Sequence, residues 1–168
     1  MMKRTLIAWV EDKPGVLNRI ASLFRRRAFN IESLTVGHTE TPGISRMTIV
    51  VDSSRTDAQK VAQNLEKLVN VIHVQDISEA PAVMLDVALI KVQSSDPRDR
   101  ADLMRIAETF RARVVDVGLK TLVVESTGTE EKLNSLVEVL RPFGVVEMVR
   151  TGRVAMTRGE RTLKGEAQ

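Results

Sequence analysis

Asp12-Lys13-Pro14-Gly15-Val16-Leu17 stands where a short apolar run ends and a pattern of another period begins. The run before it, residues 5–10, predicts a buried strand. Asp12 or Lys13 is expected to be the N-cap of a helix, because Pro14 is tolerated in a first helical turn. The stretch therefore predicts a strand-to-helix junction, followed by apolar residues at helical spacing, namely Leu17, Ile20, Ala21 and Phe24.

This junction has both a structural and a functional interpretation. Gly15 has no side chain, so another backbone or a ligand can approach it closely. The N–H groups of a first helical turn form an anion site that suits a carboxylate, although the same residues also make an ordinary capped helix start. Asn30-Ile31, at the helix exit, likewise has both a structural and a functional interpretation. Asn tolerates left-handed backbone geometry there, or its amide offers a donor and an acceptor to a polar ligand.

The first half of the chain continues with a hairpin, a helix and a strand. Thr41-Pro42-Gly43 is typical of a hairpin loop between two β-rich runs. A second helix is indicated by an apolar stripe at helical spacing, formed by Ala58, Val61, Ala62 and Leu65. The expected strands cover residues 5–10, 31–38, 44–51 and 69–77, and the second helix covers residues 56–68.

After a short linker the same order repeats. Asp96-Pro97 opens a helix with the stripe Leu103, Ile106, Ala107 and Phe110. Thr129 opens another helix, with the stripe Leu133, Leu136, Val137 and Leu140. The expected strands of this half cover residues 83–92, 114–117, 122–125 and 145–150.

The repeated order predicts an α+β protein of two tandem ferredoxin-like βαββαβ units. Each unit is expected to be an antiparallel four-stranded sheet with two helices on one face. The domains are expected at residues 1–78 and 83–152, with a linker at 79–82 and a polar, frayed tail at 153–168. In such a layout one sheet face stays bare, yet alternation makes both sides of residues 44–51 partly apolar. The bare face and the sheet edges favour oligomerisation.

Composition excludes several function classes. The 168 residues contain no Cys and two His, which argues against a disulfide framework, a thiolate metal site and a Cys nucleophile. Neither His38 nor His73 has a second His or a carboxylate at ligand spacing, so no metal site is expected. Motifs for nucleotide binding or hydrolysis, such as GxGxxG, GxSxG and HExxH, do not occur. We therefore expect no catalytic residues and no cofactor bound by this chain.

Charge and hydropathy also limit the partners. The net charge is +3 and evenly spread, so no polyanionic partner is indicated. Arg25-Arg26-Arg27 is expected to be a solvated helix end, and residues 45–51 lack the aromatic side chains that stack on RNA bases. No apolar run approaches the about 18 residues of a membrane span, and the N-terminus does not resemble a signal peptide. A cytoplasmic protein that binds neither nucleic acid nor membrane is expected.

At residues 12–17 the sequence resembles the ACT domain, a small βαββαβ module that binds amino acids. Further segments match the pattern of one branch of this family, namely residues 23–24, 27–36, 45–49, 89–92, 110–111 and 115–117, together with Glu147 and Arg150-Thr151-Gly152. Over nearly the whole chain, the sequence therefore resembles the small regulatory subunit of acetolactate synthase (acetohydroxyacid synthase). It departs from the family pattern at Asp12, where many members have Asn, and at Ala28 and Ala112, where Gly is frequent.

The resemblance implies a regulatory subunit without an active site, in branched-chain amino acid (valine, leucine, isoleucine) biosynthesis. Such a subunit binds and activates a large catalytic subunit, which uses thiamine diphosphate, Mg²⁺ and usually FAD. It also confers allosteric feedback inhibition, usually by valine and in some cases by leucine or isoleucine. The alternative is a free-standing amino-acid sensor built on ACT domains, although no helix-turn-helix pattern stands beside the two units.

The resemblance also implies where the effector binds. Two ACT domains pair as a homodimer, and the site combines Asp12, Lys13, Pro14, Gly15, Val16 and Leu17 of one protomer with Asn30 and Ile31 of the other. The helix N-terminus would take the effector carboxylate. Asp12 would pair with the ammonium group or orient the loop, and Asn30 would add a hydrogen bond across the interface. The branched side chain would be enclosed by Val16, Leu17 and Ile31.

Overall fold

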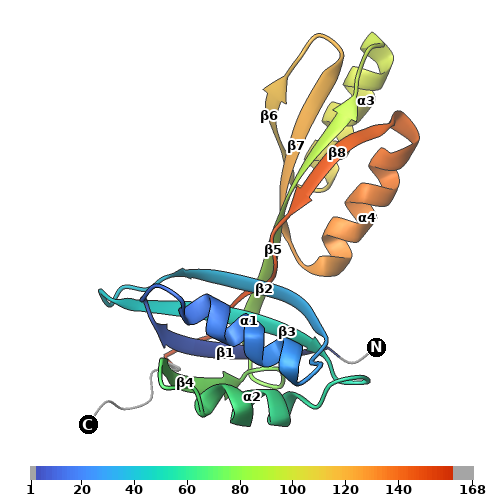
Figure 1. Cartoon of the computed structure of the whole chain (residues 1–168). Helices are drawn as coiled ribbons and strands as arrows, with labels where there is room; N and C mark the ends of the chain where they lie inside the picture. The colour runs from blue at the N-terminus through green and yellow to red at the C-terminus, as the bar shows by residue number, and fades with distance from the viewer. Residues whose placement is uncertain (1–2, 161–168) are drawn as a thin grey trace. The chain divides into compact units, whose positions relative to one another are not determined.

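Two βαββαβ repeats follow each other along the chain in the computed structural model, which describes residues 3–160 (Figure 1). Of the described residues, 3–83 and 153–160 form one compact unit, and Met84–Gly152 form the other. Both sheets are antiparallel, with the helices of each unit packed on one face. The predicted α+β class with tandem ferredoxin-like units is confirmed.

The βαββαβ part of the first unit contains four strands and two helices in the predicted order. The sheet order is β2-β3-β1-β4, so β1 and β3 lie inside and β2 and β4 are the edges. β1 pairs with both β3 and β4. The elements are β1 (Lys3–Glu11), α1 (Val16–Arg26), β2 (Ile31–His38), β3 (Ile44–Asp52), α2 (Ala58–Glu66) and β4 (Val71–Asp76).

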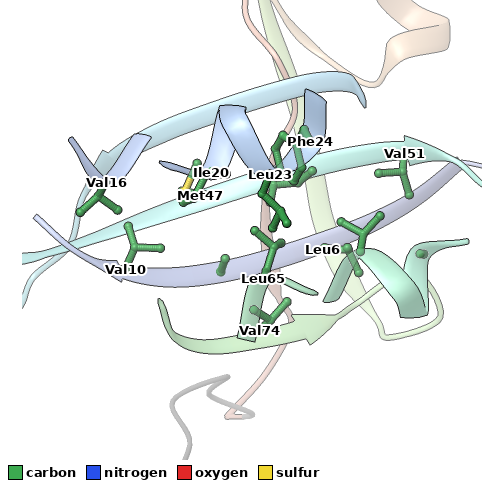
Figure 2. Packing of buried hydrophobic residues seen from close by; sticks show 14 residues of the cluster. Leu6, Val10, Val16, Ile20, Leu23, Phe24, Met47, Val51, Leu65 and Val74 are labelled. Carbon is green, nitrogen blue, oxygen red and sulfur yellow. The ribbon is translucent and has the colours of Figure 1, made fainter. Parts of the chain in front are cut away.

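The core of this unit lies between the two helices and the inner face of the sheet. Figure 2 shows its side chains from α1, α2 and the strands packed together. The expected stripe of α1 is partly wrong, because Leu17 is 51% exposed and Ala21 is also exposed. The helix is rotated so that it buries Val16, Ile20, Leu23 and Phe24, which follow the same period with a different phase.

The other face of the first sheet is not bare, which corrects the expectation from its layout. Ile7 is fully buried, and Thr48 and Val50 of β3 are also buried. The C-terminal segment reaches this face, where Arg46 donates a hydrogen bond to the carbonyl oxygen of Ala155. Arg153 donates to the Thr5 hydroxyl at 3.2 Å. A single chain therefore covers much of the face that was expected to need a second copy.

The second unit repeats the layout in the order β6-β7-β5-β8. Asp96 and Thr129 cap α3 and α4 as predicted, since their side chains accept hydrogen bonds from the backbone N–H groups of Arg98 and Lys132. The elements are β5 (Ala82–Gln93), α3 (Pro97–Thr109), β6 (Arg113–Val117), β7 (Thr121–Gly128), α4 (Glu130–Leu140), a 3₁₀ turn (Arg141–Phe143) and β8 (Val145–Arg150).

The tail expected from residue 153 onward contains a strand, β9 (Val154–Thr157), which pairs with β5. The second sheet therefore has a fifth strand beyond the four that were expected. Arg158 continues the contact, because its backbone N–H donates to the carbonyl of Pro81 at 2.8 Å. Four residues between polar and Gly-containing stretches give too short a pattern to predict, so this strand forms only because a partner is available. Residues 161–168 lie outside the described part of the tail.

Candidate functional site

The β1–α1 junction has a different cap from the one predicted. The N-cap of α1 is Gly15, with a left-handed φ of 85°, and neither Asp12 nor Lys13 caps the helix. Asp12 is held elsewhere, because its backbone N–H donates to the carbonyl of Gly43 at 2.8 Å. Glycine adopts this φ without the steric cost that a side chain would add. The prediction of a helix at this point is right, and the predicted N-cap is wrong.

The first turn of α1 is left open. No side chain caps it. The N–H of Val16 donates to Lys13 and that of Arg19 to Gly15, at 3.3 and 3.0 Å. Within residues 3–160 no acceptor is found for the N–H groups of Leu17 and Asn18. These two donors, with the positive end of the helix dipole behind them, can bind a carboxylate.

Asp12 lies beside this open turn with a half-exposed side chain. Its carboxylate is 3.3 Å from Nδ1 of His38, at the end of β2. The sequence analysis found no carboxylate at ligand spacing from His38 and therefore missed this contact. β1 and β2 both run antiparallel to β3, so the C-terminal ends of β1 and β2 lie at the same end of the sheet. The predicted strand topology was the signal from which this contact could have been inferred. The carboxylate of Asp12 can pair with an ammonium group.

The side chain of Lys13 forms an ion pair. Its Nζ is 3.1 Å from a carboxylate oxygen of Glu11, which also accepts a hydrogen bond from the Asn70 amide at 2.6 Å. The Asn70 hydrogen bond, with a smaller contribution from Lys13, lowers the pKa of Glu11 below its usual value. Pro14 and Gly15 are exposed, and a Cβ at Gly15 would meet no atom within 4 Å.

Asn30 and Ile31 lie at the other end of α1. The helix has 11 residues, so about 16 Å of helix separates them from the open turn. The backbone N–H of Asn30 donates to the buried hydroxyl of Thr56 at 2.9 Å. Its side-chain amide makes no hydrogen bond with another residue of the described chain. A single chain therefore groups residues 12–17 and keeps Asn30 and Ile31 apart from them.

The apolar residues of the predicted site also differ in exposure. Val16 is buried in the core of its own unit, whereas Leu17 is half exposed beside the open turn. Ile31 is partly buried against the core. Among residues 3–160 no cluster of three or more potential metal ligands is present, and no helix there is long and apolar enough to cross a membrane.

A ferredoxin-like unit with an open helix N-terminus after its first strand, followed by a second ferredoxin-like unit, has the fold of the ACT class. Residues 6–73 match the family described as "AHAS small subunit-like ACT domain". Residues 86–159 match the family described as "Small subunit of acetolactate synthase". The chain belongs to the family of acetolactate synthase small subunits, the regulatory partners of a catalytic large subunit.

Relatives of similar length support this assignment. The acetolactate synthase small subunit of Mycolicibacterium smegmatis is 46% identical over 157 residues, which cover 94% of this chain and 92% of the relative. That of Bacillus subtilis is 45% identical over 159 residues, with 94% and 92% covered. The crystal structure of the small subunit from Thermotoga maritima superposes with a TM-score of 0.86 at 35% identity, covering 96% of this chain and all of that one.

Proposed function

We propose that this chain activates an acetolactate synthase large subunit and makes it sensitive to feedback inhibition by valine, bound where two ACT units meet. Leucine and isoleucine are the other candidate effectors. The large subunit would carry the thiamine diphosphate, Mg²⁺ and FAD, and the complex would be cytoplasmic. The observation that carries the proposal is the open first turn of α1, with the N–H groups of Leu17 and Asn18 free, in a chain of this family.

The distance between the two halves of the site supports a dimer. Residues 12–17 and Asn30 lie at opposite ends of α1, so one chain cannot complete the site. A two-fold axis beside α1 and the edge strand β2 would place the open turn of one protomer near Asn30 of the other. Leu17 and Ala21, exposed on α1, supply an apolar surface for such a contact.

Each part of a zwitterionic amino acid would then meet a complementary group. The carboxylate would accept hydrogen bonds from the N–H groups of Leu17 and Asn18. The ammonium group would pair with Asp12, and the amide of Asn30 would add a hydrogen bond from the second protomer. Leu17 and Ile31 would contact the branched side chain. Because the effector touches both protomers, it can favour one arrangement of the pair over another, as inhibition requires.

Substitution of Gly15 with Asp tests this site. The new carboxylate would lie at the free N–H groups and compete with the effector carboxylate. We expect Gly15→Asp, reconstituted with the large subunit, to remain an activator and to lose valine inhibition. Gly159→Asp is the matched control, because Gly159 also has a positive φ (73°) and open space around a Cβ. Full valine inhibition in the Gly15 variant would refute the site.

Thermal unfolding of the unsubstituted chain with valine, leucine, isoleucine and lysine identifies the effector. A ligand present at about 100 times its Kd should stabilise the chain by about 2.7 kcal/mol. We expect the largest shift with valine and none with lysine. A chain that responds to valine but leaves the activity of the large subunit unchanged would instead be a free-standing sensor.

A further inference from the structure

A connected network of hydrogen bonds closes the base of the β1–α1 junction. The side chain of Asn70, in the turn between α2 and β4, makes two of these bonds. Its Nδ2 donates to the carboxylate of Glu11 at 2.6 Å, and its Oδ1 accepts from Nη1 of Arg19 at 2.8 Å. The backbone adds a third contact, in which the N–H of Glu11 donates to the carbonyl of Asn70 at 2.9 Å.

The two partners of Asn70 lie on either side of the candidate effector loop. Glu11 is the last residue of β1, and Arg19 lies in the first turns of α1. Residues 12–18, which include the free N–H groups, form the segment between them. We propose that Asn70 is a positioning residue that clamps both ends of this segment and so holds the effector-binding N–H groups in place. The clamp rests on the proposed function, because it acts through the effector site.

The chemistry of the amide explains why Asn suits this position. The amide group donates and accepts at once, and the clamp uses both abilities because Glu11 is an acceptor and Arg19 a donor. An Asp at position 70 could still accept from Arg19 but would repel Glu11. Hydrogen bonds to charged partners are stronger than neutral ones. The lowered pKa of Glu11, caused mainly by the Asn70 hydrogen bond, agrees with this arrangement.

The clamp lies near the surface, where its loss should act locally. The side chain of Glu11 is 35% exposed and that of Lys13 is 64% exposed. Asn70 is only partly buried and does not belong to the hydrophobic core. Substitution at position 70 should therefore loosen the junction without unfolding the unit, which makes the role in positioning separable from a role in stability.

Asn70→Asp in the full chain tests the clamp with two measurements. Hydrogen exchange without ligand should be faster in the peptide that contains Leu17 and Asn18. The valine concentration for half-maximal thermal stabilisation should rise about threefold to tenfold, the range for one lost hydrogen bond. The matched control is Asn134→Asp, which makes the same change of charge beside Arg150 in the second unit, where Asn134 accepts a hydrogen bond at 2.7 Å. The control should change neither measurement.

A swapped pair separates positioning from general damage. Glu11→Gln combined with Asn70→Asp restores a donor and an acceptor in reversed roles, so the valine response should recover. If Asn70→Asp does not fold, Arg19→Gln removes one arm of the clamp and should give the same two changes. Unchanged exchange and an unchanged valine response would overturn the clamp. Absence of any response to the three branched-chain amino acids in the unsubstituted chain would instead overturn the proposed effector site, and with it the positioning role.

Discussion

The two units begin their first helices in opposite ways. In the first unit Pro14 precedes a glycine N-cap, and no side chain closes the first turn of α1. In the second unit Asp96 is the N-cap of α3 and Pro97 is the first helical residue. The Asp96 carboxylate accepts a hydrogen bond from the backbone N–H of Arg98 at 2.7 Å. The same βαββαβ order thus produces an open helix N-terminus in one unit and an occupied one in the other. Of these two helices, α1 alone begins without a side-chain cap.

The two junctions also differ in the side chain that bridges them, which is Asn70 in the first unit and Arg100 in the second. Arg100 of α3 donates to the hydroxyl and carbonyl of Ser94 and to the carbonyls of Gly118 and Leu119. Arg100 therefore links the start of α3 to the end of β5 and to the turn between β6 and β7. A repeated fold can thus keep the same core arrangement while only one of its two first helices begins without a side-chain cap.

The outer faces of the two sheets differ as well. Ile7, on the central strand β1, is fully buried, whereas Leu89, on the central strand β5, is 39% exposed, and its neighbour Val149 is 60% exposed. A depression of about 190 Å³ lies there, lined by Leu89, Lys91, Val123, Glu147 and Val149. The first sheet is packed on both sides within one chain, and the second sheet on one side.

Truncation of these two residues gives the largest expected contrast. Ile7→Ala should lower the free energy of unfolding by about 2–5 kcal/mol, because it leaves a cavity in a closed core. Leu89→Ala should cost less than about 1 kcal/mol, because the side chain is already partly in water. Urea unfolding followed by far-UV circular dichroism measures both. Equal losses would show that the two outer faces are equally covered.

Acid should weaken the first unit through carboxyl groups whose pKa is lowered by folding. Hydrogen bonds from the hydroxyl and the N–H of Ser54 lower the pKa of Asp52. Burial raises the pKa of Asp76, but hydrogen bonds from Ser78 and Arg4 outweigh it and the net shift is downward. A lowered folded-state pKa stabilises the protein above the unfolded value of about 4, and that stability is lost as pH falls through the folded value.

Trp9, the single tryptophan, reports this effect, because it lies in the first unit and stacks on His73. The urea midpoint of its fluorescence should fall as pH decreases from about 5 to about 2. Asp52→Asn should flatten that dependence, since the group no longer titrates. A slope equal to that of the unsubstituted chain would contradict the role of Asp52.

The smallest expected effect concerns the ends of the first helix in each unit. Ala28 has a left-handed φ of 52° after α1, and Arg111 has a φ of 51° after α3, whereas Ala112 is not left-handed. Ala28→Gly should therefore stabilise the chain by about 0.5 kcal/mol, because relief of the left-handed cost exceeds the entropy that Gly adds. Ala112→Gly should destabilise it by about 0.4–1 kcal/mol. The melting temperatures of the two variants measure these effects. Shifts in the same direction would contradict the opposite effects expected at positions 28 and 112.

Much of the fold could be predicted because local patterns carried it. The caps at Asp96 and Thr129 and the stripes of α2, α3 and α4 were visible as residue types at fixed spacing. The phase of α1 was not, because Val16, Leu17, Ala21 and Leu23 allow two overlapping apolar stripes. The left-handed backbone at Ala28 and Arg111 could not be predicted either, because neither residue type favours that conformation.

The residues of the candidate site were also only partly predictable from the sequence. Residues 12–17 were found as a motif, since they are adjacent in the chain. His38 and Asn70 were missed, because they reach the junction only through the pairing of β2 with β3 and of β4 with β1. Their contacts depend on sequence separations of 26 residues for His38 with Asp12 and 59 for Asn70 with Glu11, which no local pattern encodes.

The order of the two βαββαβ repeats, the aliphatic core and the family could be read from the amino-acid sequence, because they depend on residue type and short-range spacing. The folded chain was needed to show which helix N-terminus stays open, which sheet face is covered and where β9 forms. Each of these depends on whether a polar group or an apolar surface finds a partner from a distant part of the chain. Hydrogen bonds and burial stabilise such contacts only after the fold has brought the partners together.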